Sequence, residues 1–597
     1  MTPETHSTSS GQARPCQNCK QNFSIDQADI DFYTKISVPA PTWCPECRMI
    51  RRMIWRNERF LFKRKDSLKN NDIFSGFPET VKATIYHLED WWSDNWDPMS
   101  YGKDYDFSRP FFDQFKELLY SVPWPAKSVM NMVNSEYCEQ AGNLKNCYLC
   151  FGGDSMENSA YVNRGWNAKD AFDLYETRHT ELSYDSYMAD EAYQVFYSVN
   201  IEECTDIWFS RNMVGCTNCF GCVNLRNKSY HIFNQPYSKE EYKNFMDGLN
   251  LGSYQTVVEM KKKAHELWKK NPMRFTLAIQ VQNSTGEHIE RSKNLKYCYS
   301  IHEGQNLAYC QFLEPAISDS YDYSDWGMGA SEMYESQTCG YETSRLKFCY
   351  ESWPSSQNLE YTVFTRSSSD LFGCVSLKKK QYCILNKQYT KEEYFALREK
   401  IIAQMSEMPF TDKQGRVFKY GEFFPTEFSP FAYNDTIAQD FFPLTKKEAL
   451  AKGFAWRDVE AKEYQTTKTA AELPDDIKNV DEGILKELIQ CDSCKKAYRV
   501  IQAELDFLKR INIPLPRLCP SCRYMERFKF VNPPKLWLAK CMCKGKQGMN
   551  DGSHIAYDNA VPHFHGEGQC PNEFETSYKP GRPELIYCET CYQQETI

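Results

Sequence analysis

Short apolar segments and polar turns alternate through the middle of the chain, from Asn143 to Tyr389, with no sustained helical period. The segments are rich in Tyr, Phe, Cys and Ser, and Asn, Asp or Gly residues separate them. They return every twelve residues at Cys147, Ser159, Ala171, Ser183, Val195, Ile207 and Cys219. A repeat this short cannot bury its own apolar face, so the pattern predicts a β-solenoid in which successive coils stack on one another.

The repeats form two series that end alike. Both end in the motif Phe-Gly-Cys-Val-x-Leu, which starts at Phe220 in the first series and at Phe372 in the second. A capping box follows each motif, Ser238-x-x-Glu241 in one case and Thr390-x-x-Glu393 in the other, and such boxes satisfy backbone N–H groups at a helix start. We expect each helix to cover the open end of one solenoid half and to protect its edge strands.

Cysteines at the two ends of the chain have the spacing of metal ligands. Two Cys-x2-Cys pairs lie 24 residues apart near the N-terminus, and an identical arrangement recurs near the C-terminus. The ligands of these two sites are Cys16, Cys19, Cys44 and Cys47, and Cys491, Cys494, Cys519 and Cys522. Both end in Cys-Pro-x-Cys-Arg, which indicates an internal duplication. Four thiolates make a closed tetrahedral site for structural zinc, with iron as the competing metal.

A third, degenerate module follows the second. Its knuckles are Cys570 and the pair Cys588-x2-Cys591, and the missing ligand is supplied by Cys541 or Cys543. Three histidines in the insertion before Cys570 compete as ligands, and these are His554, His563 and His565. The sequence therefore predicts about three Zn²⁺ ions per chain, one in each module.

The thirteen cysteines of the repeats are interpreted differently. Cys216, Cys219 and Cys222 match part of an iron–sulfur pattern, but the final Cys-Pro of that pattern is missing. Cysteine is small and is often buried, so we interpret these residues as interior positions of narrow coils.

An aromatic and acidic segment joins the first cysteine module to the repeats. It contains Trp91, Trp92 and Trp96 among several Asp and Glu residues. We interpret it as packing against the solenoid, with a carbohydrate or cation platform as the alternative.

Composition restricts the class of protein. Apolar residues make up 41% and charged residues 25% of 597 residues, as in globular multidomain proteins. We find neither an apolar run long enough for a bilayer nor an apolar secretory segment at the N-terminus, so we expect a cytoplasmic protein without membrane contact.

The cysteine motifs also resemble those of known zinc-binding domains. Cys-x2-Cys-x3-aromatic followed by Pro-x-x-Cys-Pro-x-Cys-Arg resembles treble-clef zinc ribbons, and Tyr587-Cys-x-x-Cys-Tyr resembles a shorter ribbon type. The order of motifs is similar to that of an uncharacterised bacterial multi-zinc-ribbon (treble-clef) family with a central repeat region. This resemblance implies ribbon folds at both ends and no established activity.

Together these features predict a mainly β fold, with treble-clef zinc ribbons at both ends flanking two tandem β-solenoid-like repeat halves with short capping helices. The expected order is an N-terminal zinc ribbon with a basic helix (13–65), an aromatic and acidic connecting segment (66–130), repeat half 1 plus capping helix (131–250), repeat half 2 plus capping helix (285–410), an aromatic connecting segment (411–458), a linker (459–487), a second zinc ribbon (488–535) and a third, degenerate ribbon (536–597).

Charge suggests one binding surface. The chain has a net charge of -9, yet eight basic residues and one acidic residue follow the first ribbon, and the basic residues are Arg48, Arg51, Arg52, Arg56, Arg59, Lys63, Arg64 and Lys65. We expect a helix from about Cys47 with one basic face, which attracts phosphates and binds RNA. The alternative is an intramolecular contact or a solvated face.

Three functions follow from these observations. The first is a non-enzymatic zinc-binding scaffold or adaptor that binds RNA through the basic segment. The second is a scaffold that binds only other proteins. The third is a glycan-active enzyme that uses groove carboxylates such as Asp170, Asp173, Asp185, Asp322 and Asp325. The sequence contains no phosphate loop, nucleophile elbow or His-Glu-x-x-His motif, which favours the non-enzymatic functions.

Overall fold

The computed structural model describes residues 13–458, 464–544, 547–548, 554–555 and 557–596 of the chain. It divides into two compact units. Unit 1 comprises Met1–Lys127, Thr276–Asp458 and Pro533–Leu536, and unit 2 comprises Ser128–Phe275, Val459–Asn532 and Trp537–Ile597. The fold is mixed α/β with large parallel sheets, and it contains more helix than the mainly β fold that the sequence predicts.

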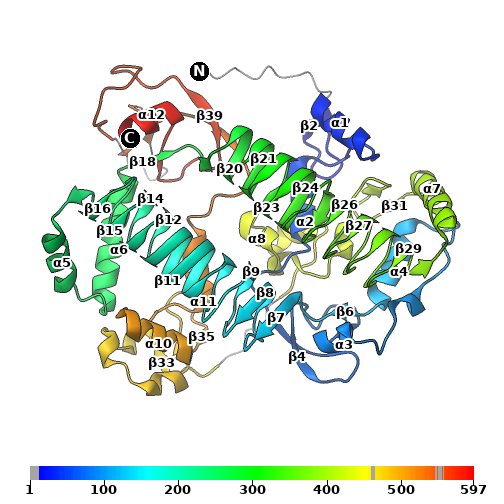
Figure 1. The fold of residues 1–597 in the computed structure, drawn as a ribbon, viewed down its shortest axis with the longest axis horizontal. Coiled ribbons are helices and arrows are strands. Elements are labelled where there is room, and N and C mark those ends of the chain that lie inside the picture. Colours follow the sequence, from blue (N-terminus) through cyan, green and yellow to red (C-terminus); the bar gives the residue numbers. More distant parts are fainter. Residues whose placement is uncertain (1–12, 459–463, 545–546, 549–553, 556, 597) are drawn as a thin grey trace. The chain divides into compact units, whose positions relative to one another are not determined.

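Unit 2 contains the first series of repeats as one stack of parallel coils, which we call the first coil stack (Figure 1). Its strands are β7 (Val129–Val133), β8 (Glu139–Lys145), β9 (Phe151–Asp154), β10 (Asn163–Trp166), β11 (Lys169–Phe196), β12 (Val199–Glu202), β13 (Thr205–Trp208), β14 (Arg211–Val214), β15 (Thr217–Phe220) and β16 (Ser229–Ile232), closed by the antiparallel β17 (Gln235–Pro236). Partners lie twelve residues apart, as in Asn163 with Tyr175 and Thr205 with Thr217. The predicted period of twelve is therefore one coil.

A finer period of three, which the sequence did not reveal, shapes each coil. Every third residue points into the stack, as Cys138, Ala141, Leu144, Cys147 and Cys150 do. The residue before an inward position commonly has a left-handed backbone, for example Asn146 with φ 54° and Asn158 with φ 50°. A twelve-residue coil thus has four sides of three residues, and its left-handed positions favour the Asn and Asp residues noted in the sequence.

The interior cysteines hydrogen-bond to the backbone. Cys216, Cys219 and Cys222 occupy three successive inward positions of one coil and are buried. The Cys216 thiol lies 3.3 Å from the carbonyl oxygen of Val214 and 3.5 Å from that of Leu225. Within the described part of the chain, the groups of side chains close enough to share a metal do not include these three.

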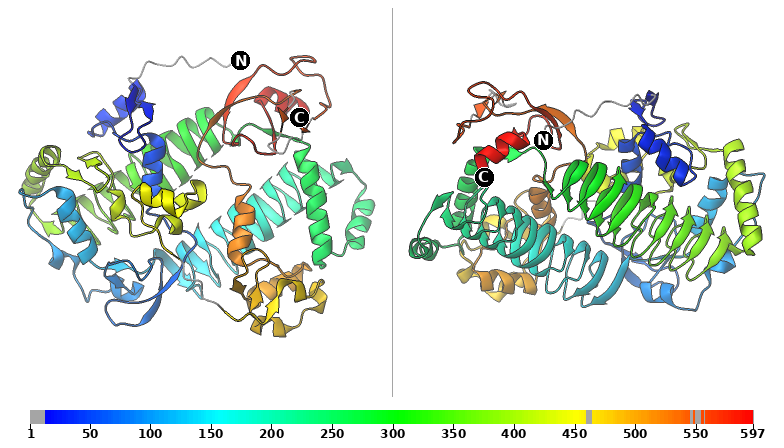
Figure 2. Two further views of the ribbon diagram at one scale, coloured as in Figure 1. Left: turned by 180° about the vertical axis from the view of Figure 1, so that it is seen from behind. Right: turned by 45° about the horizontal axis from the view of Figure 1, so that its top comes forward.

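Unit 1 contains the second series as the second coil stack. Its strands are β19 (Ala278–Ile279), β20 (Gln282–Glu290), β21 (Lys293–His302), β22 (Gly304–Ala308), β23 (Gln311–Glu314), β24 (Ile317–Gly327), β25 (Tyr334–Gln337), β26 (Ser344–Lys347), β27 (Gln357–Glu360), β28 (Ser369–Phe372), β29 (Gln381–Ile384) and the antiparallel β30 (Lys387–Gln388). Here several coils have thirteen residues, as the pairing of Gln311 with Ser324 shows. Figure 2 shows both stacks from two further sides.

Helices cover the last coil of each stack at the predicted capping boxes. Helix α5 (Lys239–Gly248) packs on β16 in unit 2 and α7 (Lys391–Glu407) on β29 in unit 1. Both capping boxes form, with Ser238 and Glu241 at α5 and Thr390 and Glu393 at α7, so these two helix starts are confirmed.

Two cysteine modules share one layout. Unit 1 holds β1 (Ala13–Pro15), β2 (Asn22–Ser24), α1 (Gln27–Lys35) and α2 (Pro45–Met53). Unit 2 holds the matching elements β34 (Ile489–Gln490), β35 (Ala497–Tyr498), α10 (Gln502–Ile511) and α11 (Pro520–Phe528). The first module therefore lies with the second coil stack, and the second module with the first coil stack.

Unit 2 also contains the third module and the helix α6 (Tyr254–Lys269). The module is built from β36 (Trp537–Lys540), β39 (Glu573–Thr576), β40 (Leu585–Tyr587) and α12 (Glu589–Thr596), and β40 pairs with β18 (Pro272–Arg274). The described part of the expected linker, 464–487, forms three short 3-10 turns and buries Leu473, Ile477 and Ile484.

The aromatic segment packs within unit 1 on the second coil stack. It follows β3 (Phe62–Lys65) and forms β4 (Asp72–Ser75), β5 (Ile85–Tyr86), α3 (Leu88–Trp92), α4 (Phe111–Ser121) and β6 (Trp124–Pro125). The ammonium of Lys378 lies 4.3 Å from the ring centre of Trp91, 5.4 Å from that of Trp92 and 5.0 Å from that of Trp96. The three tryptophans thus surround a cation of the same chain, as expected for a packing role.

Among the helices in the described ranges, none has both the length and the apolar character that crossing a bilayer requires.

The narrow interior of the first coil stack predicts that one added methyl group destabilises it. A Cβ at Gly153 would lie 2.1 Å from the Gly165 carbonyl oxygen, whereas a Cβ at Gly248 has no atom within 4 Å. We expect Gly153→Ala to lower the free energy of unfolding by about 1–3 kcal/mol. Urea titration followed by circular dichroism measures this, with Gly248→Ala as the control. Equal stability of the two variants would contradict the tight coil.

Candidate metal centres and the docking of their helices

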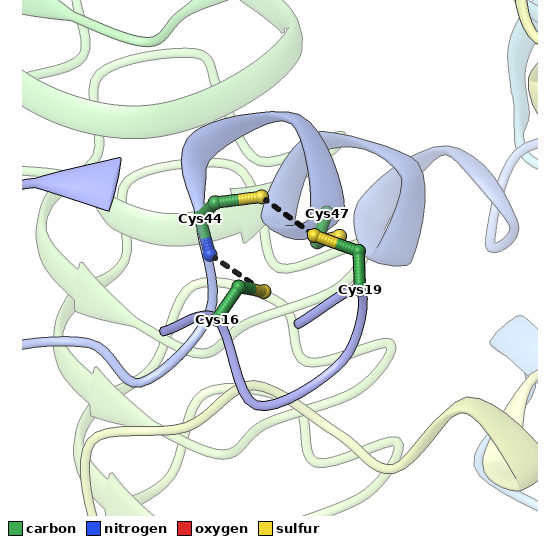
Figure 3. A group of neighbouring side chains, drawn as sticks. All are labelled: Cys16, Cys19, Cys44 and Cys47. Atoms are coloured by element: carbon green, nitrogen blue, oxygen red, sulfur yellow. Dashed lines mark hydrogen bonds between the residues drawn. The ribbon is translucent and has the colours of Figure 1, made fainter. Parts of the chain in front are cut away.

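The four N-terminal cysteines converge on one point (Figure 3). The sulfurs of Cys19 and Cys44 lie 3.7 Å apart, close to the edge of about 3.8 Å that a tetrahedron with Zn–S bonds of about 2.3 Å requires. Two donors support the site, since the backbone N–H of Cys44 lies 3.1 Å from the Cys16 sulfur and the Asn18 amide 3.3 Å from the Cys47 sulfur. Donor type and spacing therefore fit zinc.

The second tetrad repeats this geometry. The sulfurs of Cys494 and Cys519 are also 3.7 Å apart, and the Cys519 N–H lies 3.2 Å from the Cys491 sulfur. Cys44 and Cys519 are the N-cap residues of α2 and α11, each followed by a proline in the first turn. The helix start therefore positions the last two thiols of each tetrad.

The third tetrad combines Cys541, Cys570, Cys588 and Cys591, all buried. The sulfurs of Cys570 and Cys588 lie 3.9 Å apart, and the Cys588 N–H lies 3.2 Å from the Cys541 sulfur. Of the two alternatives that the sequence left open, Cys541 thus completes this tetrad. Cys543 lies in a neighbouring group with His563 and His565. The side chain of His554 lies outside the described residues.

The prediction of an exposed basic helix face after the first module is wrong. Helix α2 ends at Met53, so Arg56 and Arg59 lie beyond it. Arg48, Arg51 and Arg52 are at most 1% exposed, whereas we expected them on the surface. The expectation failed because charge patterning along a helix does not show whether an acidic partner within the protein faces the charges.

These arginines pair with two acidic residues of the second coil stack and with Glu422 of the segment that follows α7. The Arg48 Nη2 lies 2.8 Å from Asp322 Oδ2, and the Arg52 Nη1 lies 3.1 Å from Asp322 Oδ1 and 3.3 Å from Glu335 Oε2. Arg51 pairs with Glu335 at 2.7 Å and with Glu422 at 2.8 Å. Helix α2 is thereby held on β24 and β25 of the same unit.

Unit 2 contains the same network around α11. Arg523 and Arg527 follow the last cysteine of the second module at the positions that Arg48 and Arg52 occupy in the first. Arg523 lies 2.7 Å from Asp173, and Arg527 lies 3.0 Å from Asp173 and 3.2 Å from Asp185. These contacts hold α11 on β11.

The residues that contact these arginines occupy one corner position on successive coils, the acids as ion-pair partners and the two tyrosines through ring contacts with Arg48 and Arg523. They are Tyr161, Asp173 and Asp185 at intervals of twelve residues in the first stack, and Tyr309, Asp322 and Glu335 at intervals of thirteen in the second. All six have left-handed backbones. Neighbouring coils are about 4.8 Å apart, and arginines four residues apart on a helix are about 6 Å apart, so successive helical turns meet successive coils.

Burial and neighbouring positive charges shift the pKa values of these carboxylates in opposite directions. Burial would raise the pKa of Asp185, but Lys261 and Arg527 lower it to about 2. Burial raises the pKa of Asp173 despite Arg523 and Arg527, because this side chain is more completely removed from water. A buried carboxylate of this kind destabilises the fold if its basic partners are removed.

The other predicted nucleic-acid residues also have partners. Arg56 pairs with Glu58 at 2.8 Å, and Arg59 with Asp440 at 2.7 Å. The Arg64 guanidinium donates to the Pro78 carbonyl at 3.0 Å, and the exposed Lys63 and Lys65 both face Asp72. The structure offers no support for nucleic-acid binding by this segment.

The carboxylates considered for glycan chemistry are engaged as well. Asp173, Asp185 and Asp322 bind the docking arginines, Asp170 lies 3.2 Å from Arg510, and the buried Asp325 accepts a hydrogen bond from Gln337. These five carboxylates therefore all have partners within the chain. The sequence signal that could have found their role is the match between paired acids in both repeat series and paired arginines after both cysteine modules.

A cleft of about 550 Å³ lies in unit 2 between α6, α11 and the first coil stack, lined among others by Lys261, His265 and Arg582. Burial lowers the pKa of His265 to about 4, and its ring lies 4.4 Å from that of Trp268. Lys261 is paired with Asp185 and Arg582 with Glu584, so the charged groups of the cleft serve the packing of the unit.

Comparisons with known proteins identify no family. No family model matches the chain, and no curated protein matches it. Among solved structures, one similarity is to a putative acetyltransferase from Desulfovibrio desulfuricans G20, at 10% identity over 47% of this chain and 74% of that one, with a TM-score of 0.11. A similarity this low carries no argument about fold or function.

The geometry of the three tetrads predicts that each binds a structural zinc ion. We expect elemental analysis of the purified protein to find at least three zinc ions per chain, and Cys16→Ser to lose one of them. Because closed thiolate sites contribute folding energy directly, chelation should unfold the cysteine modules and leave the β signal of the coil stacks largely intact in circular dichroism. A coloured iron protein, or fewer than three zinc ions, would contradict this.

The docking network predicts that the two residues of each buried pair make non-additive contributions to the free energy of unfolding. We expect Arg48→Met to destabilise unit 1 by about 3–5 kcal/mol, because Asp322 and Glu335 lose a buried counter-charge. The double variant Arg48→Met with Asp322→Leu should recover much of that loss, which a double-mutant cycle of unfolding free energies measures. Lys63→Met, at an exposed pair, is the control. Additive effects of the two substitutions would contradict the pairing.

Proposed function

We propose that the protein is a non-enzymatic zinc-binding scaffold that binds other proteins. In this proposal the two coil stacks are β-solenoids, and the cysteine modules are treble-clef ribbons that clamp them. The supporting observation is the use of both ribbon helices for intramolecular docking through Arg48 and Arg52, and through Arg523 and Arg527. A ribbon whose basic helix is buried against its own solenoid has a structural role.

The exposed side of the first coil stack is the proposed partner surface. One column on successive coils reads Val133, Lys145, Glu157, Lys169, Glu181 and Tyr193. Lys145 and Lys169 are 59% and 50% exposed, and each pairs with the glutamate of the next coil. The neighbouring column begins with Asn134, whose amide donates to Asn146 at 3.1 Å. Solenoids commonly present such extended surfaces to protein partners.

The RNA-binding scaffold remains the competing function, and one experiment separates the two. Lysine-directed cross-linking in cells, followed by purification and mass spectrometry, should recover a defined protein linked through Lys145 or Lys169. We expect the Lys145→Gln, Lys169→Gln and Tyr193→Ser triple variant to reduce recovery of that protein at least tenfold, with zinc content unchanged.

A matched variant controls for charge. Lys243→Gln with Lys262→Gln removes two exposed charges from the helices α5 and α6, which contribute no residue to the column, and should leave recovery unchanged. Co-purifying RNA whose binding falls steeply with salt would contradict the protein-only scaffold. Equal recovery with the triple variant would contradict the proposed surface.

A further inference from the structure

The third cysteine module contains a second set of metal donors beside its tetrad. Cys543, His563, His565 and Cys591 each offer one ligand atom, and these four atoms lie within 4.8 Å of one another. Cys591 also belongs to the tetrad with Cys541, Cys570 and Cys588. We propose that this module binds two zinc ions that share the Cys591 thiolate.

The hydrogen bonds of both histidines leave a lone pair facing the site. The His563 Nε2 lies 2.7 Å from the Glu595 carboxylate, so this nitrogen donates and Nδ1 is left as the acceptor. The His565 Nδ1 lies 2.7 Å from the Gly568 carbonyl oxygen, so here Nε2 is the acceptor. A metal-binding histidine is typically held in this way by a carboxylate or carbonyl on its outer nitrogen.

Both acceptor nitrogens face the same sulfur. The Cys543 Sγ lies 3.1 Å from His563 Nδ1 and 3.2 Å from His565 Nε2. A thiol has one hydrogen for these two acceptors, and a thiolate would face two lone pairs. A zinc ion at the centre removes this conflict, and its S–N tetrahedral edge of about 3.6 Å is close to both distances.

Further contacts anchor the site in the module. The Asn559 amide donates to the Cys543 sulfur at 3.0 Å. Glu595 is buried, and it also accepts from the Tyr557 hydroxyl at 2.8 Å and from the Ala560 N–H at 2.9 Å. The carboxylate is therefore fixed and can hold only one orientation of the His563 ring.

Charge favours a second ion. Zinc in the tetrad alone leaves two excess negative charges on a buried site, because four thiolates surround one Zn²⁺. A second zinc with Cys543 and two neutral histidines reduces the excess to one, since five thiolates then surround two ions. A lower net charge costs less in a low-dielectric interior. Two sulfurs and two imidazoles also form a common zinc ligand set.

The alternative is a Cys543–His563–Glu595 unit with a reactive thiolate. Cys543 is 0% exposed, and the second imidazole of His565 has no role in such a unit. A buried sulfur between two neutral imidazoles is suited to a closed metal site, whereas reactive cysteines lie in accessible, electropositive surroundings.

Metal counting tests the proposal on the full-length protein. We expect four zinc ions per chain in the wild type, three in His563→Ala and in His565→Ala, and two in Cys591→Ser. His87→Ala, which removes an exposed histidine of unit 1, should keep four. Three ions in the wild type, or an unchanged count in both histidine variants, would overturn the second site.

Two further measurements do not depend on the folding of the variants. In the cadmium-loaded wild type, NMR should show two metal resonances coupled to each other through the shared sulfur, and uncoupled resonances would overturn the bridging role of Cys591. Cys543 in the zinc-loaded wild type should resist alkylation in mass spectrometry. Rapid alkylation at Cys543 would favour the reactive-thiolate alternative and overturn the proposal.

Discussion

Buried pairing between arginines and carboxylates is the interaction on which both units depend. In each unit a helix that starts at the last cysteine knuckle places two arginines, four residues apart, against acids on successive coils. Removing either partner would leave an uncompensated charge away from water, which costs far more than a surface pair contributes. The pairs therefore fix which helix lies on which stack and at which coil.

Zinc and this pairing are physically linked. The tetrads fix the knuckles, and the knuckles fix where α2 and α11 begin, because Cys44 and Cys519 are their N-cap residues. Arg48 and Arg523 come one residue after the last metal ligand, so metal binding sets the position of each guanidinium. Loss of zinc from either tetrad would consequently loosen the docking of its helix as well as its own module.

The two cysteine modules match in their contacts as well as in their cysteines. Asp29 and Glu504 occupy matching positions in α1 and α10 and are both 1% exposed. The Tyr309 hydroxyl lies 3.2 Å from the Asp29 carboxylate, and the Tyr161 hydroxyl 3.4 Å from that of Glu504. The corner residues keep the network in register although the coils differ in length, because each coil contributes one residue to the column whether it has twelve residues or thirteen. Each cysteine module is thus matched with one coil stack, the first module with the second stack and the second module with the first.

The sequence by itself determined the features that depend on local spacing. Cys-x2-Cys pairs, the twelve-residue repeat and the capping boxes each involve residues close along the chain, and the structure contains parallel coils, two capped helices and cysteine tetrads at both ends. Tertiary structure alone decided the use of the charges, since Arg48 and Asp322 lie far apart in sequence and either one alone resembles a surface residue. It likewise decided that Cys541 joins the tetrad while Cys543 faces two histidines, because His563 and His565 lie 20 and 22 residues further along the chain from that sulfur. Whether a polar group binds an outside partner or one in its own chain depends on burial, and burial is set by contacts between segments that no local pattern records.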